Sequence, residues 1–462
     1  MNALWTSAEA EAATLGHASR AFEAGGISID TRTLEPGDLF VALKGEARDG
    51  HDFVAAAFDA KAAAALVARD PGGVSKGAAL LRVGHTQRAL EDLGRASRAR
   101  TNAKIVAVTG SAGKTTTKEM LRLAFGALGR THASAASYNN QWGVPLTLAA
   151  MPRDTEFGVI EIGMNHFSEI RALVSFARPH VALVTTIAPA HLEFFGSCEA
   201  IADAKSEIFE GLAPGGAALI PADSPYADRL AQRAKQAGVT RILTFGRAAN
   251  ADARLVSAED GDGGQKVEAK ILGTPVALRI GASGAHIALN AVGALLAVAE
   301  CGGNLFNAAA ALSHFEALTG RGAQFRVAIA GGHVDVIDES YNANPASMEA
   351  ALALLGAAST KGRRIAVLGD MLEMGAEGPA HHAALAAAIE TARVDSVFAN
   401  GPQMKALWDA LPASRRGAYG AVSADIAPKL IETLEPGDVV LVKGSLGSKM
   451  AVVIDALKAM AG

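Results

Sequence analysis

The sequence predicts an α/β protein of three domains whose sheets are mainly parallel. With 462 residues, 50% of them hydrophobic, the chain is too long for one core and can bury several. Between Ile105 and about Thr319, short apolar strands alternate with helical stretches, which is typical of a parallel sheet with helices on both faces. The same alternation resumes beyond Gly320-Arg321-Gly322, which predicts a further sheet.

The first domain is predicted over residues 1–97 as a small α/β unit. A basic stretch at 94–104, poor in large apolar side chains, marks the boundary. Within this domain, Ser28–Thr33 and Asp38–Leu43 are strand- and turn-like, and Phe53–Val67 is predicted to be an alanine-rich helix.

The second and third domains each hold their own predicted sheet. Residues 98–319 form the second domain, with an antiparallel addition at Asp252–Ile280; residues 320–462 form a Rossmann-like third domain. The strands expected in the second domain are Ile105–Val108, Phe157–Ile162, Val181–Thr185, Ala217–Ile220 and Ile242–Thr244. Those expected in the third are Val334–Asp338, Ile365–Leu368, Ser396–Ala399 and Val439–Val442.

Charge and composition exclude several classes of protein. A net charge of −4 gives neither a nucleic-acid footprint nor a polybasic membrane patch. Cys198 and Cys301, the two cysteines, have no metal-type spacing and form no disulfide framework. The first residues lack the apolar core of a signal peptide, and the most apolar window, Ala285–Ala299, is too short to span a bilayer. We expect a cytoplasmic monomer with no nucleic-acid partner and no membrane insertion.

A phosphate-binding loop follows the first strand of the second domain. Its residues are Gly110, Ser111, Ala112, Gly113, Lys114, Thr115 and Thr116. Glycines let backbone N–H groups approach an anion, and the helix N-terminus adds partial positive charge. Lys114 would reach the outer phosphates and Thr115 a Mg²⁺ ion. Val108 stands where the strict Walker pattern has its first glycine, so this is the shorter form; a mere tight connection is the alternative.

Polar residues at later strand ends suggest a metal site beside this loop. Glu161 ends an apolar strand, where ligands bind in open α/β sheets, and could hold a magnesium ion; a buried structural ion pair is the alternative. His191 also follows a strand end, although an isolated histidine among apolar residues is usually structural. Lys205 lies in a helical segment, and its position alone indicates little.

Other candidates contact the base, ribose or phosphate of a nucleotide. His286 and Asn290 share one helix face, and a buried asparagine needs a partner, either a purine edge or a local group. Arg321, at the second boundary, could reach a terminal phosphate when domains close, or could be a surface charge. Asp338 ends a strand and could accept from a ribose hydroxyl.

Further polar turns are candidates for substrate contacts. Tyr341, Asn342 and Asn344 form an asparagine-rich turn that could bind peptide groups or cap the helix starting near Ser347. In the first domain, Ser28, Thr31 and Arg32 fall in a turn that suits a second anionic ligand or simple turn capping. The similar stretches 35–45 and 435–445 end in Lys44 and Lys443, so both strand ends could aim a lysine at substrate, or both could be a common Pro-Gly-Asp turn.

Taken in order, these segments resemble the Mur ligases over nearly the whole chain. The resembling segments are SIDTRTLEPGDLFVALKGEARDGHDFV, TGSAGKTTTKEM, SYNNQWGVPLTL, EIGMNHFSEI, AHLEFFGS, AKSEIF, HIALNA, DESYNANPASMEAAL, VLGDMLEMG and VKGS. Several are weak singly, but their joint order is very specific. Within the family they are most similar to the branch that adds D-alanyl-D-alanine. The resemblance implies a UDP-binding N-terminal domain, a P-loop-type ATPase domain and a C-terminal ligase domain.

The resemblance also implies residue roles and a reaction. ATP and Mg²⁺ would meet Lys114, Thr115, Glu161 and His191, and Lys205 would take up CO₂ as a carbamate that ligates metal. His286 and Asn290 would meet adenine, Arg321 phosphate and Asp338 ribose; Thr31 and Arg32 would meet UDP, and Asn139 and Asn140 substrate. The expected substrates are UDP-MurNAc-tripeptide and D-Ala-D-Ala, joined through an acyl phosphate. Closure of the domains about hinges near residues 100 and 320 would exclude water.

Two departures from the family pattern bear on the expected activity. Members often read K-G-S-R near the end, whereas Leu446 follows Ser445 here, so a contact to the dipeptide is in doubt unless Lys449 compensates. Asn-Ala-Asn-Pro replaces the D-N-P-R signature of the diaminopimelate-adding ligase and argues against that branch. A folylpolyglutamate-type ligase and a nucleotide-binding scaffold without catalysis are the competing hypotheses.

Overall fold

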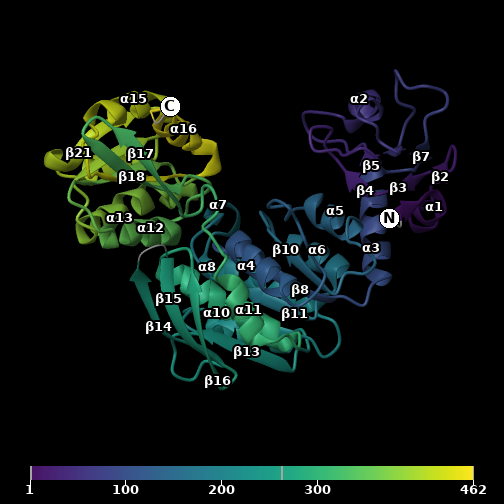
Figure 1. Cartoon of the computed structure of the whole chain (residues 1–462), viewed down its shortest axis with the longest axis horizontal. Coiled ribbons are helices and arrows are strands. Elements are labelled where there is room, and N and C mark those ends of the chain that lie inside the picture. The colour runs from purple at the N-terminus through teal and green to yellow at the C-terminus, as the bar shows by residue number, and fades with distance from the viewer. Residues whose placement is uncertain (1–2, 262–263, 461–462) are drawn as a thin grey trace.

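Three α/β domains, each with its own sheet, make up the chain. The structure, a computed structural model, describes residues 3–261 and 264–460. The central domain lies between the N-terminal and C-terminal domains (Figure 1). The predicted fold class is confirmed. No helix in the described ranges is long and apolar enough to cross a membrane.

The N-terminal domain holds a five-stranded sheet in the order β2-β7-β6-β5-β4, parallel except for the β2–β7 pair. Its strands are β2 (His17–Ala18), β4 (Gly26–Ser28), β5 (Asp38–Val41), β6 (Ala64–Val67) and β7 (Leu80–Arg82); a separate pair is β1 (Trp5–Thr6) with β3 (Glu23–Ala24). Its helices are α1 (Ser7–Thr14), α2 (Val54–Asp59) and α3 (Thr86–Ala99).

The helix expected over Phe53–Val67 is wrong in its second half. Helix α2 stops at Asp59, the chain turns at Lys61 with φ 68°, and β6 follows as a strand inside the sheet. All four β6 residues are fully buried between β5 and β7. Tertiary packing here overrides the helix preference of alanine.

The central domain holds a nine-stranded sheet in the order β16-β15-β14-β13-β12-β11-β8-β10-β9. Its strands are β8 (Lys104–Thr109), β9 (Thr131–Ala133), β10 (Phe157–Glu161), β11 (Val181–Val184), β12 (Ala217–Pro221), β13 (Arg241–Gly246), β14 (Ala253–Gly261), β15 (Gly264–Ile271) and β16 (Thr274–Ile280). The five strands predicted here are confirmed, as is the antiparallel addition, which continues the same sheet.

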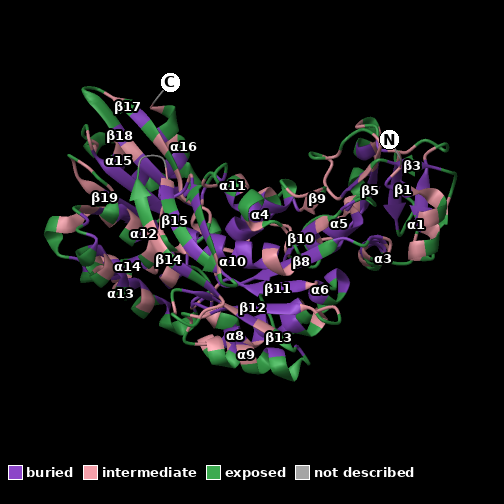
Figure 2. Cartoon of the chain, turned by 60° about the horizontal axis from the view of Figure 1, so that its bottom comes forward, coloured by how far each residue is buried: buried purple, intermediate pink, exposed green. Residues whose placement is uncertain are grey.

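Helices cover both faces of the central sheet. They are α4 (Lys114–Gly126), α5 (Gly143–Ala149), α6 (Glu169–Ala177), α7 (Leu192–Phe195), α8 (Cys198–Ser206), α9 (Ala227–Gln236), α10 (Ala285–Glu300) and α11 (Leu305–Leu312). Alternate residues of β8 enter two different cores: Val106 packs with α4 and α10, and Ile105 with α6 and α8. Figure 2 shows the central strands buried and the outer face of α9 exposed.

The C-terminal domain holds a six-stranded sheet in the order β17-β18-β22-β19-β20-β21. Its strands are β17 (Ala323–Ile329), β18 (Gly332–Glu339), β19 (Arg364–Gly369), β20 (Ser396–Asn400), β21 (Arg416–Gly420) and β22 (Val439–Lys443). Its helices are α12 (Pro345–Ala357), α13 (Gly378–Thr391), α14 (Met404–Ala410), α15 (Ser423–Thr433) and α16 (Ala451–Ala459). The four predicted strands are confirmed; edge strands β17 and β21 were not expected.

Candidate functional site

A cavity of about 720 Å³ lies between the central and C-terminal domains. It collects residues from the phosphate loop, the ends of β10, β11, β18 and β22, and the start of α10. Sixteen of the predicted residues line it: Ser111, Ala112, Gly113, Lys114, Thr115, Thr116, Asn139, Glu161, His191, His286, Asn290, Arg321, Tyr341, Asn342, Asn344 and Lys443. Segments more than 300 positions apart in sequence therefore share one cavity.

The loop between β8 and α4 is shaped as an anion cradle. Gly110 has φ 151°, and a Cβ atom there would lie 1.9 Å from the Thr185 Oγ1. Gly113 has φ 80°, and a Cβ atom there would lie 2.9 Å from the Asn290 Nδ2. Both positions need glycine, and both keep the backbone open toward the cavity. Lys114 Nζ donates to Gly110 O at 2.8 Å, so the ammonium folds over the loop.

Residues that follow β11 hold this loop by hydrogen bonds. Thr185 Oγ1 donates to Ala112 O at 2.5 Å, and Ser111 Oγ donates to Ala188 O at 2.9 Å. The cradle is therefore held by side chains as well as by the sheet.

Glu161 presents a free carboxylate oxygen beside the cradle. Its Oε1 accepts from Asn139 Nδ2 at 2.7 Å and from Thr115 Oγ1 at 3.2 Å. Its Oε2 is buried with no hydrogen-bond partner among the described residues. A buried, unpaired carboxylate oxygen is costly unless a cation or donor meets it, so the donor set fits a magnesium ion.

Lys114, Lys205 and His191 lie near one another, and Lys114 also lies near Glu161. Lys205, which was predicted for this site, is not among the residues that line the cavity. Lys205 is buried, and no hydrogen bond or ion pair holds its ammonium among the described residues. Burial, with the charge of Lys114 nearby, places the pKa of Lys205 well below its ordinary value. The pKa of Lys114 is also lowered by burial, against the opposing charge of Glu161. The Nδ1 atom of His191, a residue with φ 57°, lies against the Glu373 carboxylate of the C-terminal domain. Burial lowers the pKa of His191 despite the opposing effect of that carboxylate.

Arg321 reaches from the C-terminal domain to the central one. Its guanidinium lies 4.0 Å from the centre of the Tyr341 ring, and its Nη2 donates to Ser137 Oγ at 3.5 Å. Its charge also lowers the pKa of Lys114, which places the two cations near each other. Two cations facing one cavity suit a polyanion.

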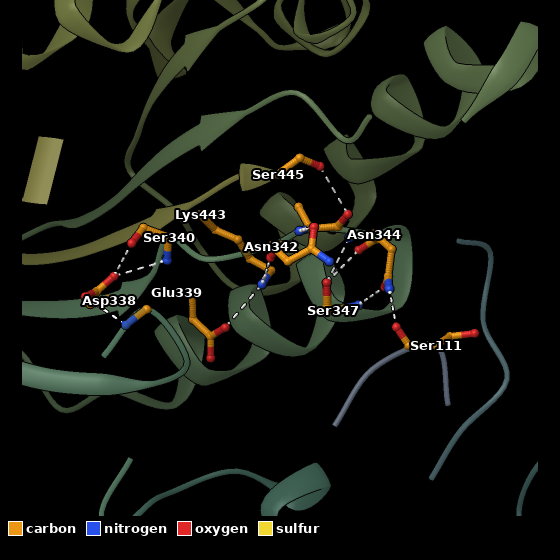
Figure 3. Close-up of polar contacts among 11 residues, drawn as sticks. Ser111, Asp338, Glu339, Ser340, Asn342, Asn344, Ser347, Lys443 and Ser445 are labelled. Atoms are coloured by element: carbon orange, nitrogen blue, oxygen red, sulfur yellow. Dashed lines mark hydrogen bonds and ion pairs between the residues drawn. The ribbon is translucent and has the colours of Figure 1, made fainter. Parts of the chain in front are cut away.

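Asp338 is not among the residues that line the cavity. Its carboxylate is buried, accepting from Gly320 N at 3.0 Å, from Ser340 N at 3.1 Å and from Ser340 Oγ at 2.6 Å. The next residue, Glu339, faces the cavity and pairs with Lys443 at 3.1 Å (Figure 3). Successive side chains of β18 point to opposite faces of the sheet. Of the two adjacent carboxylates, only that of Glu339 therefore faces the cavity.

The asparagine-rich turn joins the two domains. Asn344 Oδ1 accepts from Ser347 N at 2.9 Å, so Asn344 caps α12, which is one of its two predicted roles. Its Nδ2 also donates to Ser111 O at 3.3 Å, across to the phosphate loop (Figure 3). Asn342 O accepts from Lys443 Nζ at 3.0 Å.

The remaining candidates lie away from this cavity. Ser28 Oγ accepts from Asp30 N, and Arg32 pairs with Asp30 in the N-terminal domain; Thr31 lies in the same turn. Asn140 Oδ1 accepts from Gly143 N at 2.9 Å in the turn that leads into α5.

The two lysines of the repeated Pro-Gly-Asp turn differ in their surroundings. Lys44 is exposed, whereas Lys443 is buried and ion-paired, so the similarity of the two stretches does not extend to the lysine environments.

Among the cavity residues that sequence reasoning missed, four polar ones bear most on the chemistry: Ser137, Thr185, Glu339 and Glu373. Thr185 and Glu339 each end a strand and could have been found by that rule; the other two lie in irregular loops. Leu446, which stands where arginine is common, lines the cavity, whereas Lys449 is not among the lining residues.

Similarity to known proteins extends over most of the chain. Residues 23–98 match the model of the Mur ligase family catalytic domain, 108–298 the Mur ligase middle domain, and 325–446 the Mur ligase glutamate ligase domain. The chain is 36% identical to the UDP-N-acetylmuramoyl-tripeptide–D-alanyl-D-alanine ligase of Escherichia coli (strain K12), over 94% of this chain and 93% of that protein.

Two further similarities agree with these matches. The protein of the same name from Bacillus subtilis (strain 168) is 33% identical, over 93% of this chain and 92% of that protein. A crystal structure of MurF from Acinetobacter baumannii matches with a TM-score of 0.85 at 30% identity, over 98% of this chain and 99% of that one.

Proposed function

The chain belongs to the Mur ligase family, and from this premise we propose that it joins D-alanyl-D-alanine to UDP-N-acetylmuramoyl-tripeptide at the expense of ATP. The product would be the UDP-linked pentapeptide precursor of peptidoglycan, with ADP and phosphate. The single observation that carries the proposal is the shared cavity, in which a phosphate cradle, an unpaired carboxylate oxygen and cations from two domains face one another.

The proposed reaction activates a carboxylate, which is a poor electrophile. Its oxygen attacks the γ-phosphorus of ATP in line, giving an acyl phosphate and ADP. The amine of the dipeptide then attacks the acyl carbon, and phosphate leaves after the tetrahedral state collapses. Lys114 and Arg321 would hold the transferring phosphate, while backbone N–H groups at 110–116 hold the others. The crevice between domains would keep water from the acyl phosphate.

Magnesium would neutralise phosphate charge when bound, and Glu161, Thr115 and His191 are the residues we propose to hold it. Lys205 is proposed to become a carbamate, because burial favours the neutral amine that adds CO₂ and the charge of Lys114 nearby would stabilise the carbamate anion. A ¹³C NMR carbamate signal in protein equilibrated with labelled bicarbonate, absent from Lys205→Met, would support this; the same signal in both would contradict it.

Nucleotide contacts follow from the cavity lining. His286 and Asn290 are proposed for the adenine side and Glu339, rather than Asp338, for the ribose, since the Asp338 carboxylate is already held by Gly320 and Ser340. The UDP end of the other substrate is proposed to bind the N-terminal domain at Ser28, Thr31, Arg32 and Lys44.

The substrate side of the cavity is proposed from its remaining lining residues. Asn139, Tyr341, Asn342, Asn344 and Lys443 would face the peptide parts of the substrates, and Asn140 would act through the turn that leads into α5. The nucleotide substrates support a cytoplasmic location, and the monomer stays a prediction.

Release of phosphate tests the reaction directly. We expect release only when ATP, UDP-MurNAc-tripeptide and D-Ala-D-Ala are all present. Single amino acids, supplied one by one in place of the dipeptide, should give no release. Turnover with glutamate or diaminopimelate instead would favour another ligase of the family, and nucleotide binding without turnover would favour a non-catalytic role.

A further inference from the structure

Lys118 is a buried lysine outside the cavity lining. It lies one helical turn after Lys114 on α4, and its side chain is only 1% exposed. Its Nζ donates to Ser134 O at 2.8 Å and to Ala136 O at 3.5 Å, and pairs with Glu119 at 2.7 Å. Burying an ammonium group costs free energy, and fixed partners offset that cost only in part. We therefore ask what these contacts of Lys118 do for the protein.

Those contacts fall on an irregular segment, residues 134–139, which we call the 134–139 loop. It connects β9 to the turn before α5 and has no ladder of backbone hydrogen bonds of its own. Ser134 Oγ donates to Ala136 O at 2.9 Å, which tightens the bend that Lys118 grips. Ala136 O also accepts from Tyr138 N at 2.8 Å, whereas Lys118 is the donor to Ser134 O. Backbone carbonyls outside regular structure need donors, and Lys118 supplies that of Ser134.

The same loop presents two side chains to the cavity. Ser137 Oγ lies 3.1 Å from Thr115 Oγ1 and accepts from Arg321, so it touches both the phosphate loop and the C-terminal domain. Asn139 Nδ2 donates to Glu161 Oε1, and Asn139 O accepts from Gly163 N at 2.8 Å. The 134–139 loop therefore fixes the orientation of Glu161 and Thr115, the residues proposed for magnesium.

We propose that Lys118 is a positioning residue, whose buried ammonium holds the 134–139 loop so that Ser137 and Asn139 orient Thr115, Glu161 and Arg321. The catalytic part of this inference rests on the proposed function. The structural part, that Lys118 holds the 134–139 loop, does not depend on it. A substitution that removes the ammonium but keeps the apolar part of the Lys118 side chain should loosen the loop. Helix α4 and the central sheet should stay folded.

Hydrogen exchange and magnesium dependence together test the proposal. In Lys118→Met, amides of residues 134–140 should exchange faster without any ligand, while those of β8 and β19 stay as protected as in the unchanged protein. The Mg²⁺ concentration for half-maximal phosphate release should rise about tenfold, as for other groups that orient metal-binding residues. The KM for D-Ala-D-Ala should stay within about twofold, and Lys118→Arg, which keeps the donors, should recover most of the magnesium response.

Glu119→Gln is the matched control, since it removes the ion-pair partner but leaves the ammonium on Ser134 and Ala136; it should resemble the unchanged protein. Unchanged exchange in the loop, faster exchange spread evenly over the central domain, or a loose loop with an unchanged magnesium response would each overturn the proposal. If Lys118→Met does not fold, Lys118→Gln is measured in the same way. Should the unchanged protein show no ligase activity, the proposed function fails, while the exchange result still decides whether Lys118 holds the loop.

Discussion

At the scale of single residues, His180 shows how the hydrogen bond of a half-buried imidazole depends on its protonation state. It precedes β11, and its Nδ1 accepts from the backbone N–H of Ile105 in β8 at 3.0 Å. This bond requires a free lone pair on Nδ1. Burial, aided by the charges of Arg98 and Lys104, lowers the pKa of His180 to about 4 from its usual 6.5.

The first prediction concerns the acid stability of the central domain. Because the folded pKa lies below the unfolded one, the unfolded chain binds more protons between pH 6.5 and about 4. The free energy of unfolding should therefore fall as pH falls through that window and level off below it. His180→Asn keeps an acceptor but does not titrate, so urea unfolding should show a weaker pH dependence there. His17→Asn, at an exposed position, is the control; identical profiles for His180→Asn and the unchanged protein would contradict the account.

Site residues could be predicted where a strand end marks the position of a functional side chain. They were harder to predict where two neighbouring residues of the same charge compete for the role. The phosphate loop, Glu161 and His191 were found from residue type and place in the chain, and all line the cavity. Asp338 was predicted to meet the ribose, but Glu339 is the carboxylate that lines the cavity, and sequence does not tell which of two adjacent carboxylates faces it. Asn344 caps α12 and also reaches the phosphate loop, so a cap and a cavity residue coincide in one side chain.

At the scale of elements, α5 belongs to two domains. Its residues Leu146 and Ala149 are buried in the core of the N-terminal domain, together with Trp5 and Leu90. Trp5 Nε1 also donates to Ala149 O at 2.9 Å. The N-terminal and central domains are therefore joined by apolar packing as well as by the chain.

The second prediction is that Leu146→Ala destabilises this shared core by about 2–5 kcal/mol, the usual loss for a buried leucine. In a Trp408→Phe background, fluorescence of Trp5 and Trp142 should report an earlier urea midpoint. Leu352→Ala, in the separate C-terminal core, is the matched control and should leave that midpoint in place. A shift of equal size with Leu352→Ala, or none with Leu146→Ala, would show that the cores are not arranged as described.

Elements with long apolar runs were predicted well, and those at edges or rich in alanine were not. The strands of the central and C-terminal domains that were predicted are fully or mostly buried on both faces, except β13, in which Ile242 and Thr244 are half-buried. Edge strand β17 alternates exposed and half-buried residues, which gives a weak signal. The β6 strand is alanine-rich, and only its neighbours β5 and β7 make it a strand.

At the scale of the whole molecule, the proposed active site depends on two domains meeting. Arg321, Glu339 and Asn344 come from the C-terminal domain, and the phosphate loop from the central one. Gly320 and Gly322 have φ 74° and 95°, a left-handed conformation that suits a turn between domains. The hinge expected near residue 320 stays a prediction, as do the domain limits at 97/98 and 319/320.

The other hinge, expected near residue 100, lies in a linker that contacts both domains. Arg100 stacks on Trp5 at 4.1 Å, and Arg98 donates to Ala177 O at 2.7 Å, so this linker is fastened on both sides. Together with the shared core around α5, these contacts join the N-terminal and central domains, and the hinge near residue 100 stays a prediction. Sequence could not reveal these contacts, because the packing partners are separated by more than 50 positions.

Transfer of oxygen from substrate to phosphate tests the central claim most directly. UDP-MurNAc-tripeptide carrying ¹⁸O in its terminal carboxylate is turned over with ATP and D-Ala-D-Ala, and the released phosphate is examined by mass spectrometry. Activation through an acyl phosphate predicts that each phosphate carries one ¹⁸O from the carboxylate. Phosphate without label, or label in AMP, would show that the cavity between the two domains activates the carboxylate in some other way.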